Sequence, residues 1–79
     1  MKLTVKLSTT LRDHVPGYAP EKGLQVEMPE GSTVAQLAQH LGLPLQDIKI
    51  VMVNGRQHQV DDPMRDGDRI AYFPAVGGG

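Results

Sequence analysis

The sequence predicts a single α+β domain, in which a mixed sheet of four to five strands carries one helix across one face. Three observations predict this fold class. Several stretches alternate apolar and polar residues with a period of two, as half-buried strands do. One stretch has apolar residues at helical spacing between a capping residue and a glycine. The length of 79 residues suffices for one domain with one thin core.

The first part of the chain contains two predicted strands separated by a long connection. Residues 2–7 alternate strictly and form the clearest strand, and residues 24–28 resume the alternation, so we expect an antiparallel pair. Between them, residues 8–23 lose the pattern and contain Pro16-Gly17 and Pro20, which break regular elements. The apolar residues that can anchor this loop to the core are Leu11, Val15 and Tyr18.

The predicted helix begins after Thr33. The Thr33 hydroxyl can cap the first turn, and Gln36 can complete a capping box, although Ser32 is a competing cap. Gly42 followed by Pro44 supplies the stop. We therefore expect a short helix packed on the sheet. Its apolar stripe consists of Val34, Leu37, Ala38 and Leu41.

A hairpin is predicted after the helix. Residues 49–53 form a β-rich run that leads into Asn54-Gly55, a strong signal for a tight turn, and residues 56–60 form a weaker return strand. Two turns follow, at Asp61-Asp62-Pro63 and at Asp66-Gly67-Asp68. The order of elements is therefore strand, strand, helix, strand, short strand and a last strand.

The last strand, residues 69–73, carries apolar side chains on both faces. Because side chains alternate along a strand, Phe73 lies on the open side of the sheet if Tyr72 faces the helix. The preceding strand then exposes either Ile50 and Met52 or its valines. Such an apolar patch is a candidate docking surface, unless the long loop near the start of the chain covers it.

Composition argues against several classes of function. Without cysteine there is no disulfide, no thiolate metal site and no thiol nucleophile. The formal net charge of -1 gives no general attraction to nucleic acid or to an anionic membrane. The chain starts without a continuous apolar run, so we expect no secretory signal and no membrane span, and a cytoplasmic location is the default. His14, His40 and His58 lie in different elements, so no metal site is expected.

The chain ends on three glycines, Gly77, Gly78 and Gly79. Glycine has more backbone freedom to lose than any other residue, so we expect a domain of residues 1–73 and a flexible tail of residues 74–79. A backbone without Cβ atoms can enter a narrow channel, and its tip carries one reactive group, the carboxylate of Gly79. A frayed end without function is the alternative.

Three motifs occur together in the last third of the chain. They are Val53-Asn54-Gly55, then Pro63-Met64-Arg65-Asp66-Gly67-Asp68, and the ending Tyr72-Phe73-Pro74-Ala75-Val76-Gly77-Gly78-Gly79. They resemble the VN(G) turn, the P-L-x-D-G-D motif and the F-F-P-P-V-x-G-G ending of the MoaD/ThiS family of ubiquitin-like sulfur carriers. Leu11-Arg12-Asp13 likewise resembles that family's L-R-E segment.

The resemblance covers most of the chain and implies a ubiquitin-like β-grasp fold. The Phe73-Pro74 pair and the segment around Arg12 favour the branch formed by small subunits of molybdopterin synthase. The short helix and the residues from Val76 to Gly79 are closer to the thiamine-pathway branch.

The resemblance also implies a chemistry for Gly79. A carboxylate is a poor electrophile, so it must be activated first. A ubiquitin-activating-type adenylating enzyme (MoeB/ThiF-like) would use ATP to do this, and a persulfide would then convert the terminus into a thiocarboxylate. The synthase large subunit would receive the sulfur. The chain itself would be a cosubstrate that binds no cofactor, and not an enzyme.

Two other functions remain open on the sequence alone. A ubiquitin-like modifier would use the same activated glycine to form isopeptide bonds, and a passive interaction domain would not use the tail. The sulfur acceptor is equally open among a molybdopterin precursor, thiazole, cysteine and a tRNA base. Arg12, Arg65 and Arg69 are able to pair with acidic residues of a partner. The candidate partner-binding residues are Phe73, Pro74, Val76, Ile50, Met52 and Arg12, beside the reactive tail of Gly77, Gly78 and Gly79.

Overall fold

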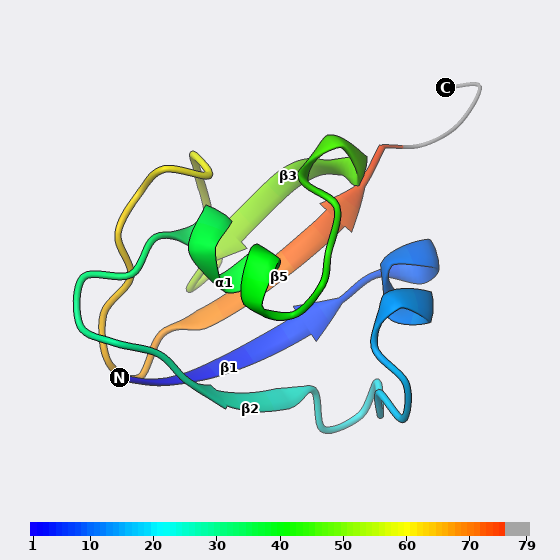
Figure 1. Ribbon diagram of the computed structural model, residues 1–79, viewed down its shortest axis with the longest axis horizontal. Coiled ribbons are helices and arrows are strands. Elements are labelled where there is room, and N and C mark those ends of the chain that lie inside the picture. Colours follow the sequence, from blue (N-terminus) through cyan, green and yellow to red (C-terminus); the bar gives the residue numbers. More distant parts are fainter. Residues whose placement is uncertain (76–79) are drawn as a thin grey trace.

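One face of a five-stranded sheet carries the α-helix of this chain, as the ribbon of the computed structural model shows (Figure 1). The structure describes residues 1–75. In chain order the elements are β1 (Lys2–Leu7), the 3₁₀ helix η1 (Thr9–His14), β2 (Leu24–Glu27), α1 (Val34–His40), the 3₁₀ helix η2 (Leu45–Asp47), β3 (Ile48–Val53), β4 (Arg56–His58) and β5 (Arg69–Pro74).

The strands follow the order β2-β1-β5-β3-β4, so β5 lies in the middle of the sheet (Figure 1). It pairs parallel with β1 and antiparallel with β3, while β1–β2 and β3–β4 are antiparallel pairs. A mixed sheet with one helix after the second strand is the ubiquitin-like β-grasp that the sequence predicted.

The core lies between the sheet and α1. The strict alternation of β1 buries Leu3, Val5 and Leu7, and leaves its polar side chains on the other face. The helix contributes the predicted stripe, of which Leu41 is only partly buried. The other buried apolar residues are Leu11, Val34, Leu37, Ala38, Leu43, Val51, Val53, Met64, Ile70 and Tyr72.

The start of α1 confirms the predicted capping box. The Gln36 N–H donates to Thr33 Oγ1 at 3.2 Å, and the Thr33 N–H donates to Gln36 Oε1 at 2.8 Å. Ser32, the competing cap, instead donates its hydroxyl to the Pro29 carbonyl at 2.7 Å. The Val34 and Ala35 N–H groups donate to backbone carbonyls of the segment before β5, so the helix start is satisfied by protein groups.

Several features of the chain differ from the predictions. A second 3₁₀ helix, η2, was not predicted, and β4 ends at His58 although the return strand was predicted over residues 56–60. The connection after β1 contains η1, a 3₁₀ helix whose period hides it from a search for helical or strand patterns. The last strand reaches Pro74, although it was predicted over residues 69–73 with the tail beginning at Pro74. Proline lacks only its own N–H, and the next donor, the Ala75 N–H, bonds to the Asp47 carbonyl at 3.1 Å.

Candidate partner-binding site

An apolar strip runs over β3 and β5 on the face of the sheet that α1 leaves open. The register pairs Ile50 with Phe73 and Met52 with Ala71, and side chains of directly paired residues share one face. Ile50 and Phe73 keep 38% and 37% of their surface exposed, which is high for large apolar residues. These four residues are called the apolar strip below.

The strip settles two alternatives that the sequence left open. Val51 and Val53 face the helix, so Ile50 and Met52 occupy the open face. The long loop does not cover Ile50 or Phe73. Instead its 3₁₀ helix η1 lies just beyond the end of β1 and contacts β5 (Figure 1).

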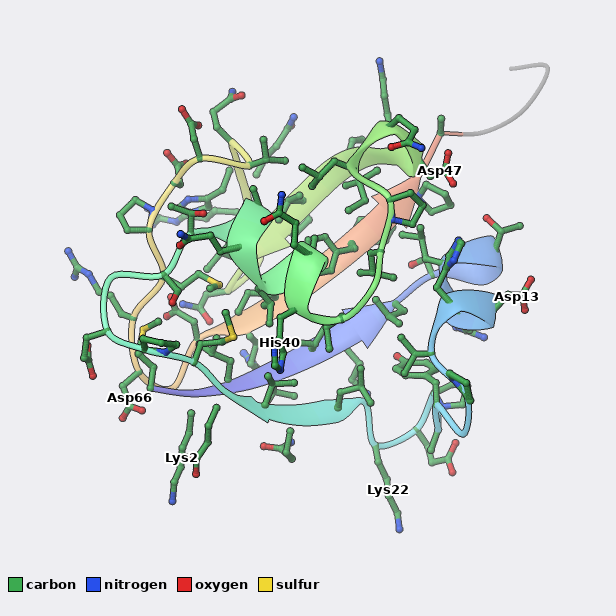
Figure 2. All side chains as sticks on the ribbon, in the orientation of Figure 1. Lys2, Asp13, Lys22, His40, Asp47 and Asp66 are labelled. Carbon is green, nitrogen blue, oxygen red and sulfur yellow. The ribbon has the colours of Figure 1, made fainter. Side chains whose placement is uncertain are left out.

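The tail leaves the sheet beside this strip. Pro74 pairs with Ile48, and the bond from Ala75 to the Asp47 carbonyl fixes the next residue against the end of η2. Figure 2 shows Asp47 next to the end of β5. Pro74 and Ala75 are called the tail root. The predicted site residues Val76, Gly77, Gly78 and Gly79 lie outside the described residues.

Arg12 has a structural role that the sequence did not predict. Its Nε–H donates to the Leu7 carbonyl at 2.9 Å, and its guanidinium carbon lies 5.9 Å from the centre of the Tyr18 ring. The Tyr18 hydroxyl accepts the Leu7 N–H at 2.8 Å. Arg12 and Tyr18 thus bind both backbone groups of the last residue of β1. The contact of Arg12 with a partner stays a prediction.

The V-N-G motif builds the turn between β3 and β4. Asn54 and Gly55 have φ angles of 52° and 83°, and a tight hairpin turn with two positive φ angles favours this pair of residues. The Asn54 side chain donates to Asp68 Oδ1 at 2.9 Å and accepts the Arg69 N–H at 2.9 Å. The motif therefore joins the hairpin turn to the start of β5.

The D-G-D motif joins the segment before β5 to the start of β1. Asp68 Oδ2 accepts the Arg65 N–H at 2.8 Å, and Asp66 Oδ1 accepts the Lys2 N–H at 2.6 Å. The Gly67 N–H donates to the Lys2 carbonyl at 2.8 Å. Lys2 and Asp66 lie at the same end of the molecule (Figure 2). The V-N-G and D-G-D motifs thus hold the sheet together at the end away from the tail root.

Tyr72 connects the sheet to the helix inside the core. It is fully buried, and its hydroxyl donates to the Val34 carbonyl at 2.7 Å. Burial raises the pKa of the Tyr72 phenol well above its usual value, because the charged form would lose its hydration. The phenol therefore acts as a hydrogen-bond donor in the fold and not as an acid.

A shallow hollow of about 390 Å³ lies next to the apolar strip. Sequence reasoning named Arg69 as a charge for a partner but missed Lys6 and the hollow itself. Neither can be seen without the register of the three strands that meet there. Its lining residues are Lys6, Met52, Asn54, Gly55, Arg69, Ile70, Ala71 and Phe73.

Residues 1–75 contain neither a cluster of metal-binding side chains nor a helix that could span a membrane. No group of three histidine, aspartate or glutamate side chains within this range could hold a metal ion. The one histidine that has an ion-pair partner there, His58, has its Nδ1 at 3.1 Å from Asp62 Oδ2. None of the helices described is long and apolar enough to span a membrane.

The fold and the exposed strip define a small ubiquitin-like β-grasp protein. The chain belongs to the Mut7-C ubiquitin family, whose model matches residues 1–77. This match confirms the ubiquitin-like class that the resemblance to the MoaD/ThiS family predicted. Among curated proteins, no relative matches the chain.

Solved structures share the whole fold at low sequence identity. SAMP1 from Haloferax volcanii is 22% identical with a TM-score of 0.72, and all of both chains is covered. A putative molybdopterin converting factor subunit 1 from Pyrococcus furiosus is 23% identical with a TM-score of 0.72, over 96% of this chain and 99% of that one. In the complex of subunits 1 and 2 of the molybdopterin-converting factor from Helicobacter pylori, the matching chain is 18% identical, with a TM-score of 0.62 and full coverage of both chains.

Proposed function

We propose that this chain is a sulfur carrier whose terminal Gly79 is adenylated and converted into a thiocarboxylate. The observation that supports the proposal is the course of β5, which runs through the middle of the sheet and ends at the tail root beside the apolar strip. A partner that grips the strip would be held next to the strand from which the glycines emerge.

The chemistry requires only one group of this chain, the Gly79 carboxylate. Its oxygen attacks the α-phosphorus of ATP, and pyrophosphate leaves. The terminal sulfur of a persulfide then attacks the carbonyl carbon of the acyl-adenylate, and AMP leaves. A second thiol cleaves the S–S bond of the product and is itself oxidised to a disulfide, which leaves the thiocarboxylate. The adenylating enzyme, of the ubiquitin-activating type, binds the ATP.

The apolar strip would supply the energy for docking. Each glycine ordered in a partner's channel costs about 1–2 kcal/mol of backbone entropy, so the tail cannot hold the complex by itself. Apolar surface buried by a partner contributes about 25 cal/mol per Å², and large apolar or aromatic anchors often dominate an interface. Phe73 and Ile50 are the most exposed members of the strip. Met52, Pro74, Val76 and Arg12 complete the proposed contact set.

The acceptor of the sulfur is proposed to be a synthase large subunit in molybdenum or tungsten cofactor biosynthesis. The Helicobacter pylori structure is a complex of subunits 1 and 2 of such a factor, and this chain shares the fold of its matching subunit. A thiamine-pathway acceptor is the alternative. In either case this chain would be the non-catalytic member of the pair.

The intact mass of the protein tests the sulfur-carrier function. The chain is incubated with ATP, a persulfide donor, a thiol and the adenylating enzyme of its host, beside a variant that lacks Gly79. We expect a mass gain equal to the exchange of one oxygen for one sulfur in the full chain only. No gain, with an enzyme that is active on a known carrier, would contradict the proposal.

A ubiquitin-like modifier is the second candidate, because the matching family is described as a ubiquitin. It would use the same acyl-adenylate, but a lysine amine of another protein would attack the carbonyl carbon in place of the persulfide. Higher-mass conjugates in host extract that disappear when Gly79 is deleted would support this function. Their absence, together with the thiocarboxylate mass, would support the carrier alone.

A further inference from the structure

We propose that Asn54 is a site of spontaneous deamidation. The fold protects its amide as long as the turn between β3 and β4 stays joined to β5, and deamidation, once it has occurred, weakens this junction. Asn54 is followed by Gly55, and it is the only asparagine of the chain. The proposal goes beyond the sulfur-carrier function and does not depend on it, because it concerns one side chain at the end of the sheet away from the tail root.

The reaction needs only this dipeptide and water. The Gly55 nitrogen gives up its proton to water and attacks Asn54 Cγ, the C–N bond of the side-chain amide breaks, and ammonia leaves with a proton from water. Water then adds to either carbonyl carbon of the resulting succinimide ring and opens it, which yields aspartate or isoaspartate. Glycine has no Cβ to obstruct the ring closure. Beyond the adjoining residues, no atom lies within 4 Å of the place where a Cβ of Gly55 would stand.

Access of water does not limit the reaction at this turn. Asn54 and Gly55 are both exposed. Asn54 also lines a hollow of about 380 Å³, together with Asp68, and water can fill this hollow. Protection of the amide must therefore come from the position in which its side chain is held.

Two hydrogen bonds hold the Asn54 amide toward β5. Its Nδ2 donates to Asp68 Oδ1 at 2.9 Å, and its Oδ1 accepts the Arg69 N–H at 2.9 Å. These partners lie 14 and 15 residues further along the chain, so the side chain is fixed to another segment. Ring closure would draw Cγ toward the Gly55 nitrogen, and it therefore requires both hydrogen bonds to break first.

The products differ from asparagine in charge or in backbone length. Aspartate in place of Asn54 would put a second carboxylate where the amide now lies, 2.9 Å from Asp68 Oδ1, and like charges repel instead of forming a hydrogen bond. Isoaspartate carries the main chain through its Cβ, so the two-residue turn that pairs Val53 with Arg56 gains one main-chain atom. Either product weakens the junction, and loss of the ammonia makes the change irreversible.

The mass of the intact chain tests the protection. The exchange of an amide for a carboxylate raises the mass, and fragmentation places the gain at Asn54 or at a glutamine. The folded chain in neutral buffer is compared with the same chain unfolded in urea and with a capped peptide of residues 52–57. We expect the folded chain to gain mass at least about tenfold more slowly than both, because two hydrogen bonds must break first. Equal rates, a gain at another residue, or no gain in the unfolded chain would overturn the proposal.

Two variants of one motif separate these hydrogen bonds from general stability. Asp68→Ala removes the acceptor of the Asn54 amide, while Asp66→Ala removes the acceptor of the Lys2 N–H and leaves that amide bonded. We expect deamidation at least about threefold faster in Asp68→Ala than in Asp66→Ala, after correction for their urea midpoints. Equal corrected rates would overturn the protection. Should Asp68→Ala fail to fold, the comparison with the peptide decides.

An exchange of charges tests the weakened junction. Asn54→Asp produces the aspartate form directly, and we expect its folding equilibrium constant, from urea titrations, to fall about tenfold. When Asp68→Asn is added, an amide again faces a carboxylate, so the double variant should recover most of the loss. A wild-type urea midpoint for Asn54→Asp, or no recovery in the double variant, would overturn the proposed effect on the junction.

Discussion

Tyr72 is the residue on which the alignment of helix and sheet depends most directly. It belongs to the central strand, it is fully buried, and its hydroxyl reaches the carbonyl of the first residue of α1. In the resembled motif this position is a phenylalanine, so the extra oxygen has no counterpart in the motif. The hydrogen bond with Val34 explains why a polar atom is tolerated in the core, since buried hydroxyls without a partner are costly.

Removal of this hydroxyl should lower stability without changing the fold. Tyr72→Phe loses one buried hydrogen bond, and we expect the free energy of unfolding to fall by about 1 kcal/mol in urea titrations. Tyr18→Phe serves as a comparison at a partly exposed site, where the hydroxyl that is lost accepts the Leu7 N–H. An unchanged urea midpoint for Tyr72→Phe would contradict this account.

The same burial predicts a loss of stability in alkaline solution. Below pH about 10 the Tyr72 phenol is protonated in both states, and its contribution is complete. At higher pH the unfolded chain releases this proton while the folded chain, whose Tyr72 pKa is raised, keeps it. The unfolding free energy should then fall by up to about 1.4 kcal/mol per pH unit from this group. Urea titrations from pH 8 to 11 should show this fall in the wild type but not in Tyr72→Phe.

At the scale of elements, the turn between β3 and β4 has two separable requirements. Asn54 must adopt a positive φ, and its side chain must reach the start of β5. Asn54→Gly keeps the first and loses the second, while Asn54→Ala loses both. We expect unfolding free energies in the order wild type, Asn54→Gly, Asn54→Ala, with about 1 kcal/mol between successive members. Equal stabilities of the two variants would mean that the φ angle carries no strain here.

The elements that could be predicted from sequence are those with local causes. The alternation of β1 and the capping box around Thr33 lie within a few residues, and both were predicted correctly. The 3₁₀ helix η1 was missed because its period matches neither the helical nor the strand pattern, and because its place depends on the burial of Leu11 in the core. The periodicity of apolar residues does not predict contacts of this kind.

At the scale of the whole molecule, the open face should govern association with partners. Ile50→Thr removes part of the apolar strip, and we expect the KM for this chain in the adenylation reaction to rise about tenfold with little change in kcat, because the tail is untouched. Val60→Thr is a matched control, since Val60 is as exposed as Ile50, at 39% against 38%, but lies outside the strip. Equal effects of the two substitutions would show that the strip has no special role.

The sequence could not specify that face completely, because the face is a product of register. Alternation within β5 correctly separated Phe73 from Tyr72, but only the pairing of β5 with β1 and β3 brings Lys6 and Met52 to either side of Ala71. Pairing between Thr4 and Arg69 joins strands from opposite ends of the domain. A local sequence pattern therefore cannot predict which residues face each other across the β1–β5 pair.

The place of β5 between two hairpins also has a kinetic consequence. The hairpins β1–β2 and β3–β4 share no ladder of their own, and the sheet becomes continuous only when β5 inserts between them. The pairing of β1 with β5 joins residues 4–7 to residues 69–72, and pairings between such distant parts of a chain slow folding. Phe73 stands opposite Ile50 only once β5 has paired with β3. A partner that grips both Ile50 and Phe73 would therefore bind only chains in which β5 has already paired with β3.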